Sequence, residues 1–183
     1  MKDLIKYIKI FEDVSVDSVV LDTVKTLDYL LKPASPLTEV FATSNFSLVS
    51  LIRNDPVPED MFETIFGPLQ TGLVQCLEKY NNQVDYFKYN KISGTESFSI
   101  TKYPTGGFAG KKIDYIPFRA RSISFHLTLN DNYIGGELSF FEGELVIPTK
   151  KNQVVLFPSA FLFPYEILPI TSGERWAIEN WAH

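Results

Sequence analysis

The side chains that could take part in chemistry lie mostly between Tyr103 and Trp181. Lys112 and Asp114 stand two residues apart, so in a regular strand they project from the same face. A carboxylate beside an ammonium favours the protonated lysine. The ammonium of Lys112 could therefore offset the charge of Asp114, and Lys112 could form a Schiff base with a 2-oxo acid only if burial favoured its neutral amine.

His126 and His183 are the two histidines of the chain. His126 lies in a predicted strand whose residues alternate between a polar row and an apolar row: Ser122, Ser124, His126 and Thr128 against Ile123, Phe125, Leu127 and Leu129. We expect the apolar row to face helices and the polar row, with His126, to face a pocket. Asp114 and His126 could bind a metal weakly, but the sequence offers no evident third ligand.

Short strands separated by turn residues must position these groups. Many short strands with turn residues at regular intervals favour a closed or two-sheet antiparallel barrel, with a jelly roll as the first choice. The expected strands are Thr101–Tyr103, Ile113–Tyr115, Ser122–Leu129, Glu137–Phe141, Val154–Phe157, Tyr165–Leu168 and Arg175–Trp181.

The first half of the chain predicts fewer strands and two helices. We expect a strand at Tyr7–Phe11, then a helix capped by Ser15 or Asp17 and ending near Leu31. Val40–Ile52 could be strand or loop. The second helix should run from Pro58 to about Tyr80, with a kink or a split at Gly67-Pro68. The turn at Ser93-Gly94 predicts a hairpin between Val84–Tyr89 and Phe98–Tyr103.

The 183 residues predict one domain, with residues 1–100 supporting a barrel core formed by residues 101–183. A net charge of −5 without a basic cluster argues against nucleic-acid binding. Val154–Ile170 is apolar but contains three prolines, so strands explain it better than a membrane span. With one cysteine, Cys76, and no visible signal peptide, we expect a reducing, cytoplasmic location.

The same C-terminal stretch resembles the 2-oxoglutarate/Fe(II)-dependent oxygenases of the prolyl-hydroxylase type. The resemblance rests on four segments: Tyr103–Asp114, which contains Gly106-Gly107 and Lys112-Ile-Asp114, then Arg121–Asn130, Gly135-Gly136 and Phe157–Trp181. It covers about the last 80 residues in order. It implies an α+β fold, a double-stranded β-helix (jelly-roll) barrel with N-terminal helices packed on one sheet.

The resemblance fails at the metal position. The family holds iron with a His-x-Asp pair and a distal His, a facial triad. Here Lys112 stands at the first His position, Tyr165 stands at the distal position, and only Asp114 matches. An ammonium has no lone pair, and a phenol becomes a good ligand only near pH 10. We therefore expect no bound Fe(II).

Other positions of the resemblance concern a carboxylate ligand. Arg175 matches the family arginine that grips the distal carboxylate of 2-oxoglutarate through a two-pronged hydrogen bond. Thr128 matches a position that often reaches the co-substrate, and Tyr103 opens the matching segment. The guanidinium of Arg175 could hold 2-oxoglutarate or a similar carboxylate, or it could form an internal salt bridge.

Three functions remain open from the sequence. The first is a non-catalytic binding module that takes a small carboxylate or a protein partner, with no cofactor, nucleic acid or membrane. The second is a metal-independent enzyme in which Lys112, Tyr165 and His126 supply acid–base groups and Arg175 positions a carboxylate substrate. The third is an active oxygenase or hydroxylase with atypical ligands.

Overall fold

A computed structural model describes residues 2–12, 14, 16, 18–33, 47–51, 59–84, 92–116 and 120–183. The expected helix caps at Ser15 and Asp17 lie outside these residues, as does most of the expected strand at Val84–Tyr89. Within the ambiguous stretch Val40–Ile52, the described part Ser47–Leu51 is a strand, β3.

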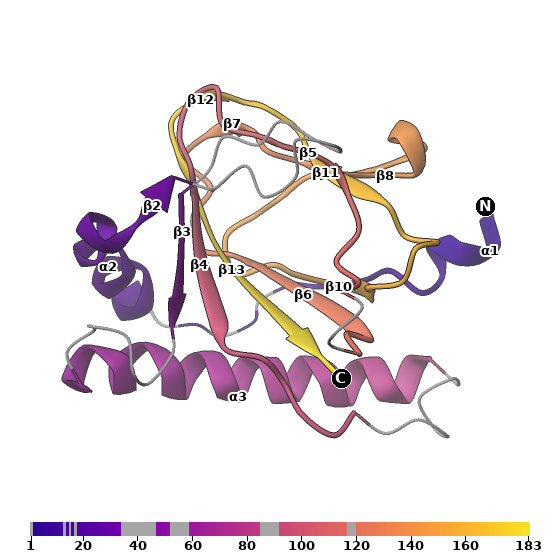
Figure 1. Ribbon diagram of the computed structural model, residues 1–183, viewed down its shortest axis with the longest axis horizontal. Coiled ribbons are helices and arrows are strands. Elements are labelled where there is room, and N and C mark those ends of the chain that lie inside the picture. The colour runs from indigo at the N-terminus through magenta and orange to yellow at the C-terminus, as the bar shows by residue number, and fades with distance from the viewer. Residues whose placement is uncertain are drawn as a thin grey trace.

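Two antiparallel sheets form the body of the described structure, and the loops between them close a barrel (Figure 1). The larger sheet has the strand order β1 (Lys9–Phe11), β10 (Val154–Pro158), β6 (Ile123–Thr128), β13 (Arg175–Ala182), β4 (Phe98–Tyr103), β3 and β2 (Lys32–Pro33). The smaller sheet has the order β5 (Ala109–Lys112), β11 (Tyr165–Ile167), β8 (Leu138–Phe140) and β9 (Leu145–Ile147). A third pair joins β12 (Ile170–Ser172) to β7 (Ile134–Gly135).

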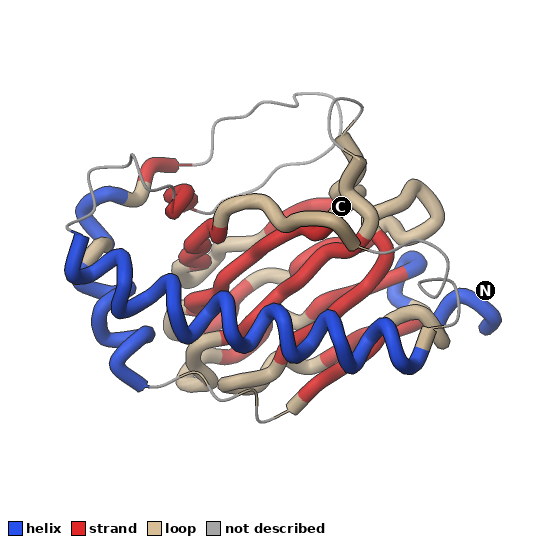
Figure 2. Tube along the Cα trace, turned by 90° about the horizontal axis from the view of Figure 1, so that it is seen from below, coloured by secondary structure: helices blue, strands red, loops and turns tan. Residues whose placement is uncertain are grey.

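The helices cover one face of the larger sheet. α3 (Glu59–Gln83) crosses that face, with α2 (Ser18–Thr26) packed beside it (Figures 1 and 2). The short helices are α1 (Lys2–Ile5), η1 (Asp28–Leu30) and η3 (Phe141–Gly143). No helix in the described ranges is long and apolar enough to cross a membrane. The fold is thus α+β, a jelly-roll barrel with N-terminal helices on one sheet, as the sequence predicted.

The expected split of the second helix at Gly67-Pro68 is wrong, because α3 continues through Pro68. Ile65 before the proline and Leu69 after it are both buried against the sheet. Most helical stability in proteins comes from packing of an apolar face. This packing holds the two halves as one helix despite the hydrogen bond that proline removes.

The larger sheet separates two apolar clusters. Its outer face packs Phe125, Leu127, Trp176 and Ile178 against the helices. Its inner face contributes to a second cluster inside the barrel, with Tyr103, Val155 and Phe157 meeting Phe140 and Tyr165 from the smaller sheet. The alternation predicted for β6 is therefore confirmed, since Phe125 and Leu127 face the helices.

One strand of the sequence prediction is misplaced. The strand is Ala109–Lys112, and Ile113–Tyr115 lies beyond its end. Ile113 and Tyr115 are 40% and 49% exposed, whereas Asp114 between them is buried. The alternation of exposed and buried residues resembles a strand, but hydrogen bonds to side chains on other strands hold Asp114 inside.

Candidate functional site

Cross-strand rows on the inner face of the larger sheet bring the predicted polar residues together. The register pairs Arg175 with Tyr103 on β4, and it pairs Glu179 with His126 on β6. Between these rows lies a row of small side chains, in which Ala177 pairs with Thr101 and Thr128. Residues of one parity on three neighbouring strands therefore share the barrel interior.

Asp114 is the centre of a buried hydrogen-bond network. The Tyr165 hydroxyl lies 3.0 Å from each of its carboxylate oxygens. The Ser124 hydroxyl donates to Oδ2 at 2.7 Å and also lies 2.9 Å from the Ser159 hydroxyl. Burial by itself raises the pKa of Asp114, but the opposite effect of the Lys112 ammonium and the His126 imidazole is larger. The pKa of Asp114 is therefore well below its usual range. Asp114 is therefore a carboxylate stabilised by protein groups.

Lys112 places its ammonium between two carboxylates. Its Nζ lies 3.8 Å from Oδ1 of Asp114 and 4.0 Å from Oε2 of Glu179. It also lies 5.2 Å from the centre of the Tyr165 ring. The Lys112 side chain is 28% exposed, whereas the two acidic side chains are almost fully buried. The ammonium thus offsets part of a buried negative charge from the rim of the barrel.

His126 lies beside Tyr165 and Glu179 and is fully buried. Its Nε2 lies 3.1 Å from the Tyr165 hydroxyl oxygen, and its ring stacks on Phe157 at 5.4 Å. Its Nδ1 has no hydrogen-bond partner among the described residues and lies 3.7 Å from Oε1 of Glu179. A phenol has one proton, so when Tyr165 donates it to Asp114, Nε2 of His126 must donate to the phenol oxygen.

Tyr165 and Tyr103 are neutral hydrogen-bonding groups. Burial and the charge of Asp114 raise the pKa of Tyr165 well above its usual value. Burial and the charge of Glu179 likewise raise the pKa of Tyr103, whose hydroxyl lies 3.4 Å from Oε1 of Glu179. Ionising either phenol would add a negative charge beside a buried carboxylate.

Arg175 is fully buried, and most of its guanidinium nitrogens have no hydrogen-bond partner among the described residues. Its Nη2 lies 3.4 Å from the Thr128 hydroxyl, and its guanidinium lies 5.5 Å from the centre of the Tyr103 ring. Nε and Nη1 have no hydrogen-bond partner in the described part of the chain, and no described carboxylate lies within 4.0 Å of the guanidinium. The internal salt bridge that the sequence left open is thus not found among these residues. A buried guanidinium requires acceptors, so the geometry favours an anionic ligand.

The residues at the family's metal position do not fit an Fe(II) triad. Lys112 supplies a cation, the Tyr165 phenol is neutral, and both oxygens of Asp114 already accept hydrogen bonds. Across the described residues, no group of three or more His, Cys, Asp or Glu side chains could hold a metal ion. Facial-triad chemistry requires two imidazoles and a carboxylate with open positions, and this donor set differs from it at two of three places.

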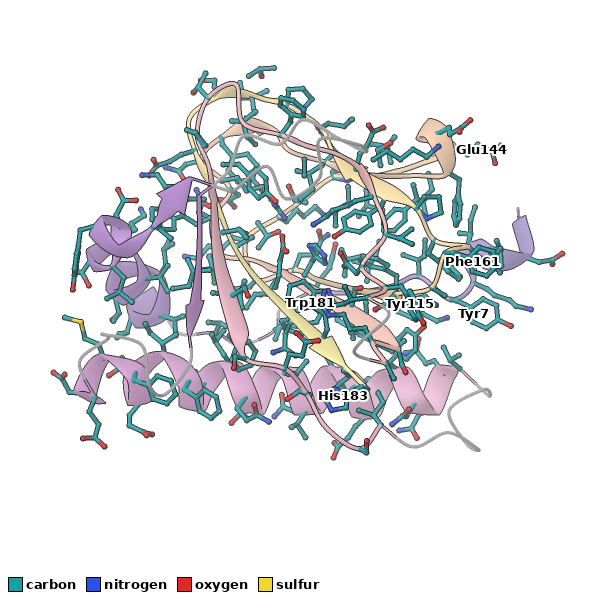
Figure 3. The ribbon with its side chains drawn as sticks, viewed as in Figure 1. Tyr7, Tyr115, Glu144, Phe161, Trp181 and His183 are labelled. Carbon is teal, nitrogen blue, oxygen red and sulfur yellow. The ribbon has the colours of Figure 1, made fainter. Side chains whose placement is uncertain are left out.

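Sequence reasoning placed Lys112, Asp114, Tyr165 and His126 as a candidate cluster, and in the structure they lie together. It did not assign a role to Glu179, which contacts this cluster through Lys112 and His126. Its shared strand parity with Arg175 was the available signal. Ser124 was expected on the pocket-facing row but without a role, and Ser159 was missed. Glu144 and His183 lie outside this cluster, and both side chains are exposed (Figure 3).

Comparison with a family model and with solved structures agrees with the jelly-roll fold. Residues 98–183 match the model of the 2OG-Fe(II) oxygenase superfamily. A search of curated proteins finds no match.

Several solved prolyl hydroxylases have a similar fold. A prolyl hydroxylase from Trichoplax adhaerens, solved with a hypoxia inducible factor oxygen degradation domain peptide, has a TM-score of 0.74 at 17% identity, covering 97% of this chain and 83% of its own. A prolyl-4-hydroxylase from Pseudomonas putida gives 0.65 at 18% identity, covering 100% and 95%. The viral collagen prolyl hydroxylase from Paramecium bursaria Chlorella virus-1 gives 0.65 at 14% identity, covering 96% and 95%. Residues 98–183 thus resemble the 2OG-Fe(II) oxygenase superfamily, in a chain with a prolyl-hydroxylase-like fold.

Proposed function

We propose that this protein is a 2-oxoglutarate/Fe(II)-oxygenase-like barrel that has lost iron binding and acts as a non-catalytic binding module for a small carboxylate. The observation that carries the proposal is Arg175, a fully buried guanidinium whose Nε and Nη1 have no partner among the described residues. A carboxylate can accept two parallel hydrogen bonds from one edge of a guanidinium, and each such edge of Arg175 contains Nη2 and one of these two unpaired nitrogens. Thr128 beside it offers a further hydroxyl.

The degenerate metal position supports the loss of iron. Lys112 brings a positive charge to within 3.8 Å of Asp114, where a metal cation would repel it. An oxygenase with atypical ligands would need Tyr165 as a phenolate, and the raised pKa of Tyr165 opposes that form. Asp114 is then the single family ligand left, which is too few to retain Fe(II).

A metal-independent enzyme is a second candidate, and one contact favours it. The Tyr165 hydroxyl lies 3.1 Å from Nε2 of His126 and 3.0 Å from Asp114, so a proton could move along this chain of groups. Arg175 would then position a carboxylate substrate. Mass spectrometry can detect conversion of a bound carboxylate into a product. Conversion that is abolished in His126→Gln would replace the binding-module proposal with this one.

Metal content and carboxylate binding test the proposal together. Protein purified without chelator should contain no stoichiometric iron by elemental analysis. Calorimetry should detect binding of small carboxylates to the metal-free protein, and Arg175→Met should abolish it, because the methionine fills space without offering donors. Lys150→Met, which changes a 64% exposed lysine on the surface, is the control. Stoichiometric iron with turnover of 2-oxoglutarate would contradict the proposal.

We also propose a cytoplasmic location. Cys76 lies buried in α3, and burial raises the pKa of its thiol to about 11. A thiol of this kind stays protonated and unreactive at neutral pH. Fractionation of cells that express the protein measures its location, and recovery outside the cytoplasmic fraction would contradict the proposal.

A further inference from the structure

The polar residues on the inner face of the larger sheet extend from Arg175 to Glu179, and the two ends of this region carry different charges. At one end stands Arg175, whose positive charge has no carboxylate within 4.0 Å among the described residues. At the other end stand Asp114 and Glu179, both buried, with the single ammonium of Lys112 between them. The first end therefore attracts one anionic group, and the second end already holds more carboxylates than ammonium groups.

The neighbouring groups do not reverse this balance. Tyr165 and Tyr103 are neutral because burial and nearby carboxylates raise the pKa of each phenol. His126, with one carboxylate near each ring nitrogen, adds either no charge or one positive charge. With a neutral imidazole the second end is net negative, and with an imidazolium it is neutral. In neither state is it positive.

The strand geometry directs a ligand from the first end toward the second. Arg175 and Glu179 are four residues apart on β13, which is about 13 Å along the strand. The row between them contains Thr101, Ala177 and Thr128, which are small and uncharged. This row of small side chains therefore lies between the Arg175 end and the end that holds Glu179 and His126.

We infer that the ligand of this site carries a single negative charge, so that the protein selects a small monocarboxylate over a dicarboxylate such as 2-oxoglutarate. The inference rests on the proposed function, since it concerns the carboxylate bound by Arg175. A second carboxylate at the far end of the ligand faces Asp114 and Glu179 with one ammonium to offset both. Like charges brought together in a site of low polarity reduce affinity.

Matched ligand pairs test this selectivity by calorimetry with wild-type protein. Pentanoate and glutarate differ by one terminal carboxylate, as do 2-oxopentanoate and 2-oxoglutarate. We expect the monocarboxylate of each pair to bind more tightly by about tenfold or more. Glu179→Gln removes one negative charge from the far end, so it should reduce the ratio of the dicarboxylate dissociation constant to the monocarboxylate dissociation constant. Glu144→Gln makes the same chemical change at an exposed site and should leave the ratio unchanged.

The outcomes separate the two proposals. Tighter binding of the dicarboxylates, lost in Arg175→Met, would overturn the selectivity and leave the carboxylate site standing. Absence of binding for all four compounds would overturn the carboxylate site and the selectivity with it. An unchanged ratio in a folded Glu179→Gln variant would show that the charge of Glu179 does not set the preference and would overturn the electrostatic argument.

Discussion

The hydroxyl of Tyr165 lies 3.0 Å from each carboxylate oxygen of Asp114. Tyr165 stands at the distal-His position of the family resemblance and Asp114 at the family carboxylate. Ser124 donates a second hydrogen bond to Asp114, and the Lys112 ammonium lies 3.8 Å away. Protein groups alone thus stabilise a carboxylate that would serve as a metal ligand in an active family member.

Replacing Tyr165 with Phe should destabilise the protein. The change leaves both oxygens of Asp114 and Nε2 of His126 without the phenol, and an unsatisfied buried polar group costs about 1–3 kcal/mol. Urea unfolding measures the loss in free energy of unfolding. Tyr29→Phe, at a side chain that is 72% exposed, is the control and should change stability by less than about 0.5 kcal/mol. Equal effects of the two changes would contradict the network.

Replacing Lys112 with Met should also destabilise the protein, because Asp114 and Glu179 lose the ammonium between them. Removing one partner of a buried ion pair costs about 3–5 kcal/mol. Partial exposure of Lys112 reduces this expectation to about 1–3 kcal/mol.

The adjacent Lys111 provides a matched control for that measurement. Lys111 pairs with Glu142 at 2.6 Å, but both side chains are more than half exposed. Solvent screens such surface pairs, so they contribute little to stability, and thermal or urea unfolding of Lys111→Met should differ little from wild type. A larger loss in Lys111→Met than in Lys112→Met would refute the central position of Lys112.

Asp114 should make stability fall in acid. Its folded pKa lies below its unfolded value, so its contribution is present above pH 4 and is lost as pH falls toward the folded pKa. The difference in free energy of unfolding between wild type and Asp114→Asn should therefore be largest near pH 7. It should shrink as pH falls below about 4. Urea titrations at several pH values measure this difference, and a constant difference would show that Asp114 ionisation contributes nothing.

Arg175→Met should cost little stability in the absence of a ligand, or raise it. An unpaired buried guanidinium is itself unfavourable, and apolar replacements of buried charges are often neutral or stabilising. Thermal unfolding without added carboxylate measures the effect. A loss above about 3 kcal/mol would point to an internal partner for Arg175 and against a ligand site.

Restoring both family histidines should create a metal site. In the double variant Lys112→His and Tyr165→His, two imidazoles join Asp114 as a complete set of triad ligand types. Calorimetry with Mn²⁺ should detect binding to the double variant and none to wild type. Adding Asp114→Ala should remove it. Equal binding of Mn²⁺ to wild type would contradict the proposed loss of the metal site.

Much of the barrel was predictable because a strand exposes its residues alternately to two faces. The alternation of β6 predicted that Phe125 and Leu127 would face the helices, and they do. Local patterns also misled in two places. Ile113–Tyr115 alternates without pairing as a strand, and α3 tolerates Pro68 because burial on both sides holds it together.

The candidate site shows the same division. The residue types at the family positions are readable from the sequence alone, namely Lys112, Asp114, Tyr165 and Arg175. Folding of the chain brings Lys112 on β5 to Glu179 on β13, and it leaves Arg175 with no carboxylate near it among the described residues. These are contacts between distant parts of the chain. They depend on strand register and on the closure of two sheets, which no local pattern of residues records.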